Sequence, residues 1–283
     1  MSQTKAAQAS RQGQDEFYSI SDEVQREYVQ VRRASKWVAF FLPHLKPGMR
    51  VLDCGCGVGS ITIDLAEIVA PGQVVGIDRD VSQLDIARRL AAERGVTNVA
   101  FEVGNVYELG YPDASFDAVL AHTILVHLND RLRALREMRR VLTRSGAIAV
   151  SDDDYSTFVF SPPDSSAQQF IELWGKYLIR NGGNPYYSRH LRGLLQEAGF
   201  AETEGHAVAA DYYGTLTETR RAAKLTQMAL QAPEFVEAAL AEGWTTQPQL
   251  DALVQALGEW GERPDAFAAV MYCAAVGWVS PRG

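Results

Sequence analysis

The sequence is poor in cysteine, and the cysteines it has are not arranged as a metal site. Only three occur in 283 residues, at Cys54, Cys56 and Cys273. Cys54 and Cys56 form C-x-C rather than C-x-x-C, and no second pair or nearby histidine completes a zinc-binding set. So few cysteines favour a reducing compartment. We therefore expect packing roles for them, with a redox or metal role as the alternative, and we predict no bound metal.

Long apolar runs and an excess of positive charge are also lacking. No stretch approaches the roughly 18 apolar residues of a membrane-spanning helix, and the polar N-terminal stretch MSQTKAAQAS does not resemble a secretory signal. The formal net charge of −8 argues against a nucleic acid as the main partner. We therefore expect a cytoplasmic protein with a small-molecule substrate, no nucleic acid and no membrane span, and we leave open a homodimer.

What the sequence does contain is an alternation of apolar strands and amphipathic helices. The predicted strands are MRVLDCG, QVVGID, NVAFEVGN, SFDAVLAH and SGAIAVSD, and helical segments follow the first, second and fourth of them. Ser60 is expected to begin the first helix, and Asn129 or Asp130 to cap a later one. Strands that alternate with helices indicate a parallel sheet with right-handed crossovers.

The alternation breaks after the fifth strand. Helical insertions are expected over residues 156–185 and 214–263, and further strands at AETEGHAVAADYY and AFAAVMYCAAVGWV. The first insertion carries five aromatics that either line an acceptor pocket or belong to the core, namely Phe158, Phe160, Phe170, Trp174 and Tyr177. We predict one domain over 1–283, with an N-terminal lid at 14–44 and a cofactor-binding core at 45–155.

The stretch VLDCGCGVGS, residues 51–60, puts three glycines in five positions directly after a predicted strand. Missing Cβ atoms let a ligand touch the backbone, and the start of the next helix offers free N–H groups. Asp78 ends the following strand, where an acid can bind a ribose diol. The spacing of Gly55, Gly57 and Gly59 is G-x-G-x-G rather than the dinucleotide fingerprint G-x-G-x-x-G.

With Asp53 in front, the pattern D-x-G-x-G-x-G resembles motif I of class I S-adenosylmethionine-dependent methyltransferases. Later segments also resemble that family, and the resemblance covers about residues 45 to 210; these segments are GNVYELGYPDASFDAVLAHTILVHLND, MRRVLTRSGAIAVSD and NPYYSRHLRGLLQEAGF. The branch of quinone and small-molecule methyltransferases is the most similar. The resemblance implies a Rossmann-like α/β fold with a seven-stranded sheet in the order 3-2-1-4-5-7-6, strand 7 antiparallel, with helical insertions and an N-terminal helical lid.

The same resemblance implies S-adenosyl-L-methionine as the cofactor. Asp53 would place the methionine end, Gly55 and Gly57 would lie against the cofactor, and Asp78 would hold the ribose hydroxyls. Further contacts are implied at Arg79 beside the adenine, Asn105 in place of the family's usual acid at the adenine amino group, Val106 through its backbone N–H, and His122 facing the methionine part.

Methyl transfer from a sulfonium requires alignment and exclusion of water, and for many acceptors a base. His127 is the first candidate base, with packing at a helix start as the alternative. Asp154 is a second candidate, unless it is a solvated or capping acid. In the N-terminal segment Tyr18 and Tyr28 could face the sulfonium or the substrate, and Arg32 could meet the methionine carboxylate; ordinary helix packing is the alternative.

We therefore predict S-adenosylmethionine-dependent methyl transfer to a small, partly apolar or aromatic metabolite, at oxygen, nitrogen or carbon. A nicotinamide-dependent oxidoreductase and a non-catalytic cofactor-binding scaffold are the alternatives. The segment Asn184-Pro185-Tyr186-Tyr187 resembles the N-P-P-Y motif of DNA amino-methyltransferases, but it follows the fifth strand instead of the fourth. We expect a turn with packed aromatics there.

Overall fold

The strands form one sheet in the order β3-β2-β1-β4-β5-β8-β6, and β7 also pairs with β8. The computed structural model describes residues 32–163 and 165–282, so Tyr18 and Tyr28 lie outside the described residues. The strands are β1 (Arg50–Cys54), β2 (Gln73–Asp78), β3 (Val99–Val103), β4 (Phe116–His122), β5 (Leu142–Asp153), β6 (Val159–Ser161), β7 (Glu202–Tyr213) and β8 (Phe267–Trp278).

The first five strands form the predicted parallel half. Strand β1 pairs in parallel with β2 and β4, and β4 with β5. Val51 and Leu52 of β1 are completely buried, because helices cover both faces of this half. Because both faces of these strands are buried, their sequences are continuous runs of apolar residues without polar alternation.

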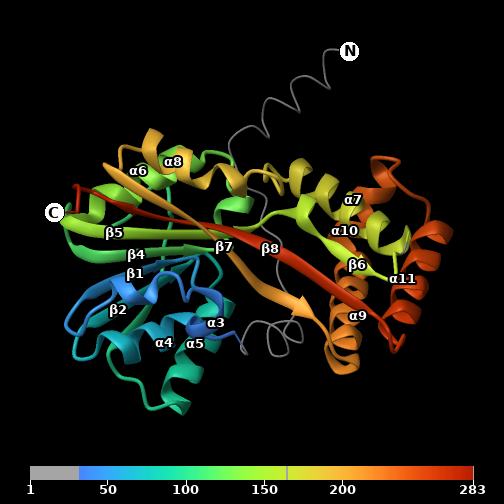
Figure 1. Cartoon of the computed structure of the whole chain (residues 1–283), viewed down its shortest axis with the longest axis horizontal. Helices are drawn as coiled ribbons and strands as arrows, with labels where there is room; N and C mark the ends of the chain where they lie inside the picture. Colours follow the sequence, from blue (N-terminus) through green and yellow to red (C-terminus); the bar gives the residue numbers. More distant parts are fainter. Residues whose placement is uncertain (1–31, 164, 283) are drawn as a thin grey trace.

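The predicted antiparallel ending is confirmed, with one addition. Strand β8 runs antiparallel to β5 on one side and to β7 on the other. The added strand β6 continues beyond the end of β5 and pairs with the first residues of β8, at Phe267 to Ala269. Figure 1 shows β8 running from the sheet into the helices at the far end. Three residues are too short for a periodic signal, which is why the sequence did not reveal β6.

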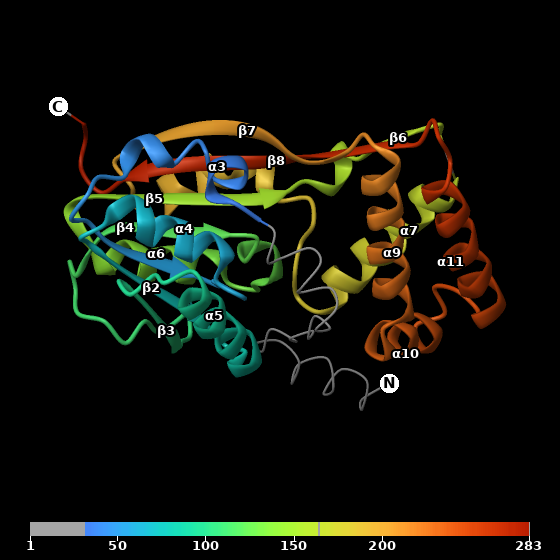
Figure 2. The same cartoon turned by 90° about the horizontal axis from the view of Figure 1, so that it is seen from below.

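Two layers of helix cover the parallel half (Figure 2). On one face lie α3 (Ala34–Trp37), α4 (Ser60–Val69) and α5 (Val81–Glu93); on the other lie α6 (Arg131–Val141) and α8 (Leu191–Glu197). Leu135 and Met138 of α6 are fully buried, as the apolar stripe of that helix predicts. Asp130 caps α6 by accepting a hydrogen bond from the N–H of Arg133 at 3.0 Å.

A second group of helices, here called the helical lobe, lies at the other end of β8 in Figure 2. Its members are α7 (Ser165–Arg180), α9 (Leu216–Gln231), α10 (Pro233–Ala241) and α11 (Gln247–Gly261). Leu230 and Phe235 are completely buried in its core. Capping boxes begin α9 at Thr215 and α11 at Thr246. The lobe thus has an apolar core of its own, separate from those of the sheet.

Candidate functional site

A cavity of about 290 Å³ lies where the parallel strands end at their carboxyl edge. This is where open α/β sheets bind ligands. Every described residue predicted to contact the cofactor lines it, together with the predicted base His127; the cofactor set is Arg32, Asp53, Gly55, Gly57, Asp78, Arg79, Asn105, Val106 and His122. The fold therefore gathers residues from four strand ends around one space.

The three glycines of the loop are required for different physical reasons. All have positive φ, between 52° and 75°, which L-residues with side chains rarely adopt. A Cβ at Gly55 would lie 2.6 Å from the side chain of Ile124, and one at Gly59 would lie 2.7 Å from Phe101. A Cβ at Gly57 would meet no atom closer than 3.7 Å. Gly57 is therefore the glycine whose missing side chain leaves space on the cavity side for a ligand.

Arg32, Asp53 and His122 line the cavity, and the resemblance assigns all three to the methionine end of the cofactor. Asp53 is buried, and burial raises its pKa to about 7, although a hydrogen bond of 2.6 Å from the Thr62 hydroxyl opposes the shift. His122 is buried with its ring stacked on Tyr272 at 5.7 Å. Burial, reinforced by the charge of Arg32, lowers the pKa of His122 to about 3, so the ring is neutral.

These cavity residues have unused hydrogen-bonding capacity within residues 32–163 and 165–282. There, neither ring nitrogen of His122 has a hydrogen-bond partner, and the same holds for Nε of Arg32. The Arg32 guanidinium lies 4.4 Å from the centre of the Trp37 ring. A guanidinium, a carboxyl group and a neutral imidazole together suit the carboxylate and ammonium of an amino acid. The residues present therefore fit the methionine part of S-adenosylmethionine.

A second set of cavity residues suits a nucleoside. Asp78 accepts hydrogen bonds from the N–H of Gly57 at 2.9 Å and of Asp80 at 3.0 Å, and each oxygen retains a lone pair for a ribose hydroxyl. The amide oxygen of Asn105 accepts the N–H of Tyr107 at 3.0 Å. An amide oxygen has a second lone pair, which could accept the adenine amino group as the resemblance implies.

Sequence reasoning missed Gln83 of α5, which lines the cavity although only 5% of its surface is exposed. Its side-chain oxygen is the atom nearest to a Cβ at Gly57. The signal was available: Gln83 is a polar residue beside Leu84 and Ala87, on the inward face of a helix that begins directly after Asp78. A buried amide there can serve the ribose side of the ligand.

His127 reaches the cavity from a loop of residues 123–129, here called the β4 loop. The loop begins with Thr123 at φ 57°, an unusual conformation for a β-branched residue. It continues with Ile124, which packs over Gly55, and a short 3-10 helix, Leu125–His127. His127 is half-buried and lines the cavity. The strained turn thus directs the loop back over the glycines of the cofactor loop.

Asp154 is not among the residues that line this cavity. Its carboxylate accepts two hydrogen bonds of 2.7 Å from Arg189 and one of 3.1 Å from the N–H of Ser156. Although burial raises the pKa of Asp154, these hydrogen bonds hold it below its usual value. The structure therefore gives Asp154 partners other than the cavity. Its neighbour Asp152 is fully buried and binds the hydroxyl of Tyr187.

The aromatics of the first insertion divide into two groups. Phe170 and Tyr177 are buried in the core of the helical lobe. Phe158, Phe160 and Trp174 are half-buried at its boundary with the sheet, where Phe158 and Trp174 also pack against the sheet cores. The core alternative from the sequence therefore applies to Phe170 and Tyr177, and none of the five aromatics lines the cavity described above.

A family profile described as a methyltransferase domain matches residues 45–184. A probable methyltransferase, ltbC, of Aspergillus luteorubrus is 30% identical over 270 residues, which cover 89% of this chain and 93% of that protein. The 27-O-demethylrifamycin SV methyltransferase of Amycolatopsis mediterranei is 33% identical, with 73% of each chain covered. The crystal structure of the [4+2]-cyclase SpnF has a TM-score of 0.56 at 23% identity, and the match covers 87% of this chain and 80% of that one.

The strand order and the glycine loop with its acid define a nucleotide-cofactor-binding α/β enzyme of the methyltransferase type. The relatives decide the family: this chain belongs to the class I S-adenosylmethionine-dependent methyltransferases. Its cofactor is S-adenosylmethionine, and the nicotinamide alternative has no support. The likeness to the cyclase concerns the fold alone, since a fold does not determine a reaction.

Proposed function

We propose that this methyltransferase transfers a methyl group to a small, partly apolar or aromatic metabolite, and that His127 takes the proton of the acceptor. The observation that carries the proposal is the position of His127, which lines the same cavity as Arg32, Asp53 and His122. A base must lie within hydrogen-bond reach of the reacting group. When bound, S-adenosylmethionine supplies a methyl group on a positively charged sulfur, with a neutral thioether as the leaving group.

The chain's own residues would bind and orient the cofactor, and they would exclude water from the reaction. Arg32 would pair with the methionine carboxylate and ionised Asp53 with the ammonium, which fixes one end of the cofactor. Asp78 would hold the ribose, and the N–H of Val106 would face the adenine. Burial of this cavity would keep water from the acceptor while His127 removes its proton.

The acceptor class is inferred from an aromatic row beside the cavity. His122 stacks on Tyr272 at 5.7 Å, and Phe158 packs in the same apolar cluster as Tyr272. Phe158 in turn stacks on Phe160 with ring centres 5.7 Å apart and planes within 5°, and Trp174 lies at the same boundary. Half-buried aromatic faces suit a flat, partly apolar molecule. The printed name of one relative, a demethylrifamycin methyltransferase, also indicates a small-molecule acceptor.

The cellular location of the protein and the absence of a nucleic-acid partner are also proposals. Within the described residues, no helix combines the length and apolarity needed to cross a membrane. The three cysteines are free, which fits a reducing compartment such as the cytoplasm. The overall charge of −8 argues against a polyanionic acceptor such as nucleic acid.

Two measurements test the proposal. Thermal shift with S-adenosylhomocysteine and with NAD should show stabilisation by the first alone. Transfer of tritiated methyl from S-adenosylmethionine should then be followed to a panel of phenols, hydroquinones, alcohols, amines and carbon acids, for the wild type and His127→Gln. Transfer to a nucleic acid or a protein in place of every small molecule would contradict the acceptor class. Equal rates for the two proteins would contradict the role of His127.

A further inference from the structure

The β4 loop that carries His127 is held from behind by a second segment, residues 182–187, here called the clasp. The clasp directly follows α7 of the helical lobe. The N–H of Asn184 donates to the carbonyl of Val126 at 2.9 Å. Gly183 lies against the same carbonyl and 3.6 Å from the Cα of His127, measured from where its Cβ would be. The backbone of Val126 and of His127 itself is therefore in contact with the clasp.

Glycines allow this close approach. A Cβ at Gly182 would lie 2.0 Å from the side-chain oxygen of Asn129, and one at Gly183 would lie 2.5 Å from the carbonyl of Val126. Neither position has room for a side chain. The clasp and the β4 loop are thus packed backbone against backbone, so that a displacement of one moves the other.

The clasp ends in a buried polar pair. The hydroxyl of Tyr187, which is 5% exposed, donates a short hydrogen bond to Oδ2 of Asp152, which is 0% exposed at the end of β5. Arg131 covers the Tyr187 ring, with its guanidinium 4.4 Å from the ring centre, and donates to the Val126 carbonyl at 3.4 Å. A buried carboxyl group and a buried phenol require each other, because either one alone would be left unsatisfied.

The pair joins elements that are far apart in the sequence. Asp152 lies on β5, Tyr187 follows α7, and Val126 belongs to the β4 loop. The N–H of Tyr155, just after β5, donates to the carbonyl of Pro185 in the clasp at 3.0 Å. On its other side the β4 loop places Ile124 on Gly55 of the cofactor loop. One continuous set of contacts therefore runs from the helical lobe through His127 to the cofactor loop.

We propose that Tyr187 and Asp152 are positioning residues: their buried hydrogen bond fixes the clasp, and the clasp fixes the β4 loop so that His127 faces the cavity. The part of the inference that concerns His127 as a base rests on the proposed function. The mechanical part, which is the support of the β4 loop by the clasp, does not. Neither residue lines the cavity, so neither contacts the reacting atoms. The half-exposed Tyr186 next door lacks this role and provides a matched control.

Hydrogen–deuterium exchange with bound S-adenosylhomocysteine tests the mechanical part. Tyr187→Phe and Asp152→Ala should each speed exchange of the amides of residues 124–128 by about tenfold, while α6 stays protected. Asp152→Asn should restore slow exchange, because an amide oxygen still accepts the phenol proton. Tyr186→Phe should change nothing. Faster exchange spread evenly over α6 and the loop, or none in the loop, would overturn the proposal.

A double-mutant cycle tests whether Tyr187 acts through His127, using an acceptor from the panel described above. Tyr187→Phe should lower the single-turnover rate by about 10-fold with unchanged affinity for S-adenosylhomocysteine, and should cost far less in a His127→Gln background. Fully additive losses would overturn the positioning role. If His127→Gln alone retains the full rate, the proposed base is wrong, and the exchange experiment then decides the mechanical part by itself.

Discussion

At the carboxyl edge of β1, β2 and β4 the cavity is built from backbone groups and short polar side chains, whereas the helical lobe presents half-buried aromatic rings. The cofactor side includes Gly57, Asp78 and Asp53, all within a continuous stretch of the sequence. The boundary of the lobe holds Phe160 of β6 and Trp174 of α7, which depend on packing for their positions. The difference fits the proposed division of work. In that proposal the cofactor side recognises a fixed molecule by hydrogen bonds, and the boundary of the lobe selects a variable one by shape and apolar surface.

The largest effect is expected at the cofactor side, from Gly57→Val. The valine would fill the only loop position that faces open space and should abolish binding of S-adenosylhomocysteine in calorimetry. Gly95→Val is the matched control: Gly95 also has positive φ, 68°, with nothing near its Cβ position, but lies outside the cavity. It carries a comparable backbone strain of about 1–2 kcal/mol without touching the ligand. If both variants bind equally well, the cavity is not the cofactor site.

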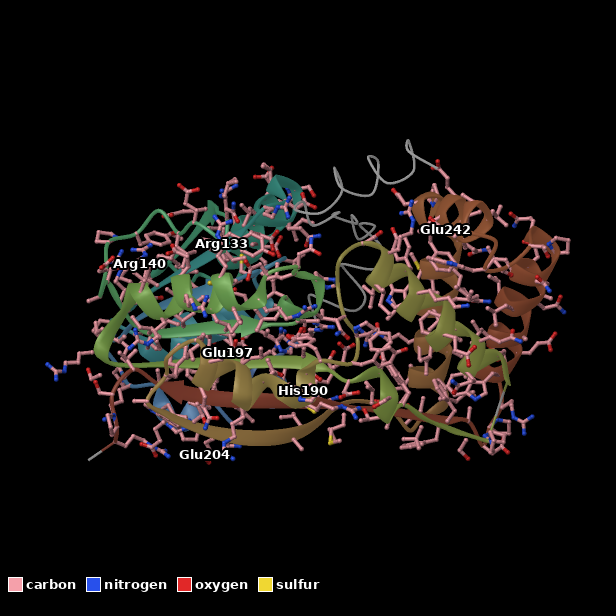
Figure 3. All side chains as sticks on the ribbon, turned by 90° about the horizontal axis from the view of Figure 1, so that it is seen from above. Arg133, Arg140, His190, Glu197, Glu204 and Glu242 are labelled. Carbon is pink, nitrogen blue, oxygen red and sulfur yellow. The ribbon has the colours of Figure 1, made fainter. Side chains whose placement is uncertain are left out.

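The second-largest effect is expected from a substitution of His127. His127→Gln should lower the methyl-transfer rate by ~10²–10⁴ while leaving cofactor affinity unchanged, because a base acts only on the acceptor. Single-turnover rates with labelled donor would measure it. His190→Gln, at the start of α8 (Figure 3), serves as the control on an exposed histidine outside the cavity. A loss of cofactor affinity in His127→Gln would assign this residue to the cofactor side instead.

Asp78→Ala should weaken cofactor binding by roughly 1.5–3 kcal/mol, because charged hydrogen bonds to the ribose are lost. The structure adds a second cause, since Asp78 also holds the N–H of Gly57. Calorimetry would measure the loss. Asp80→Ala is the control: it removes the cap of α5 but no residue of the cavity lining. Equal affinity for Asp78→Ala and the wild type would remove Asp78 from the site.

Asp53 should make cofactor binding depend on pH. Burial raises its pKa to about 7, so in the free protein its carboxyl group favours folding at low pH and loses that contribution as the pH rises through 7. Binding of an ammonium needs the ionised form. Affinity for S-adenosylhomocysteine should therefore rise about tenfold between about pH 6 and pH 8. Asp53→Asn should flatten this dependence; an unchanged slope in the variant would point to another group.

The smallest effect is expected at the boundary of the helical lobe, from Phe160→Leu in β6. The variant keeps apolar volume but removes the ring that stacks on Phe158, so the KM for an aromatic acceptor should rise by a few fold, consistent with an aromatic contact of about 0.5–1.5 kcal/mol. Cofactor affinity should not change. Phe170→Leu, in the buried core of the lobe, should lower thermal stability with little change in KM. The reverse pattern would place the acceptor elsewhere and break the proposed division.

The sequence by itself determined the cofactor side, because the groups that make it are neighbours in the chain. Asp53 lies near the end of β1, the glycines follow on the turn before α4, and Asp78 ends the next strand, so local pattern and parallel topology bring them together. The strand order was implied by the family resemblance that these motifs carry, and the sheet confirms it. The added strand β6 was not predicted, because three residues carry no period.

Only the tertiary structure decided which partners the candidate acids and the packed side chains have. Asp154 follows a strand of the sheet, which made it a candidate base. In the structure its carboxylate instead forms an ion pair with Arg189, which lies 35 residues further along the chain. Asp152 accepts a hydrogen bond from the hydroxyl of Tyr187, and the side chain of Ile124 packs directly against Gly55. These contacts join residues separated by dozens of positions, and no local pattern encodes them. They arise because a buried polar group must find a partner and a packed side chain must find space, wherever in the chain these lie.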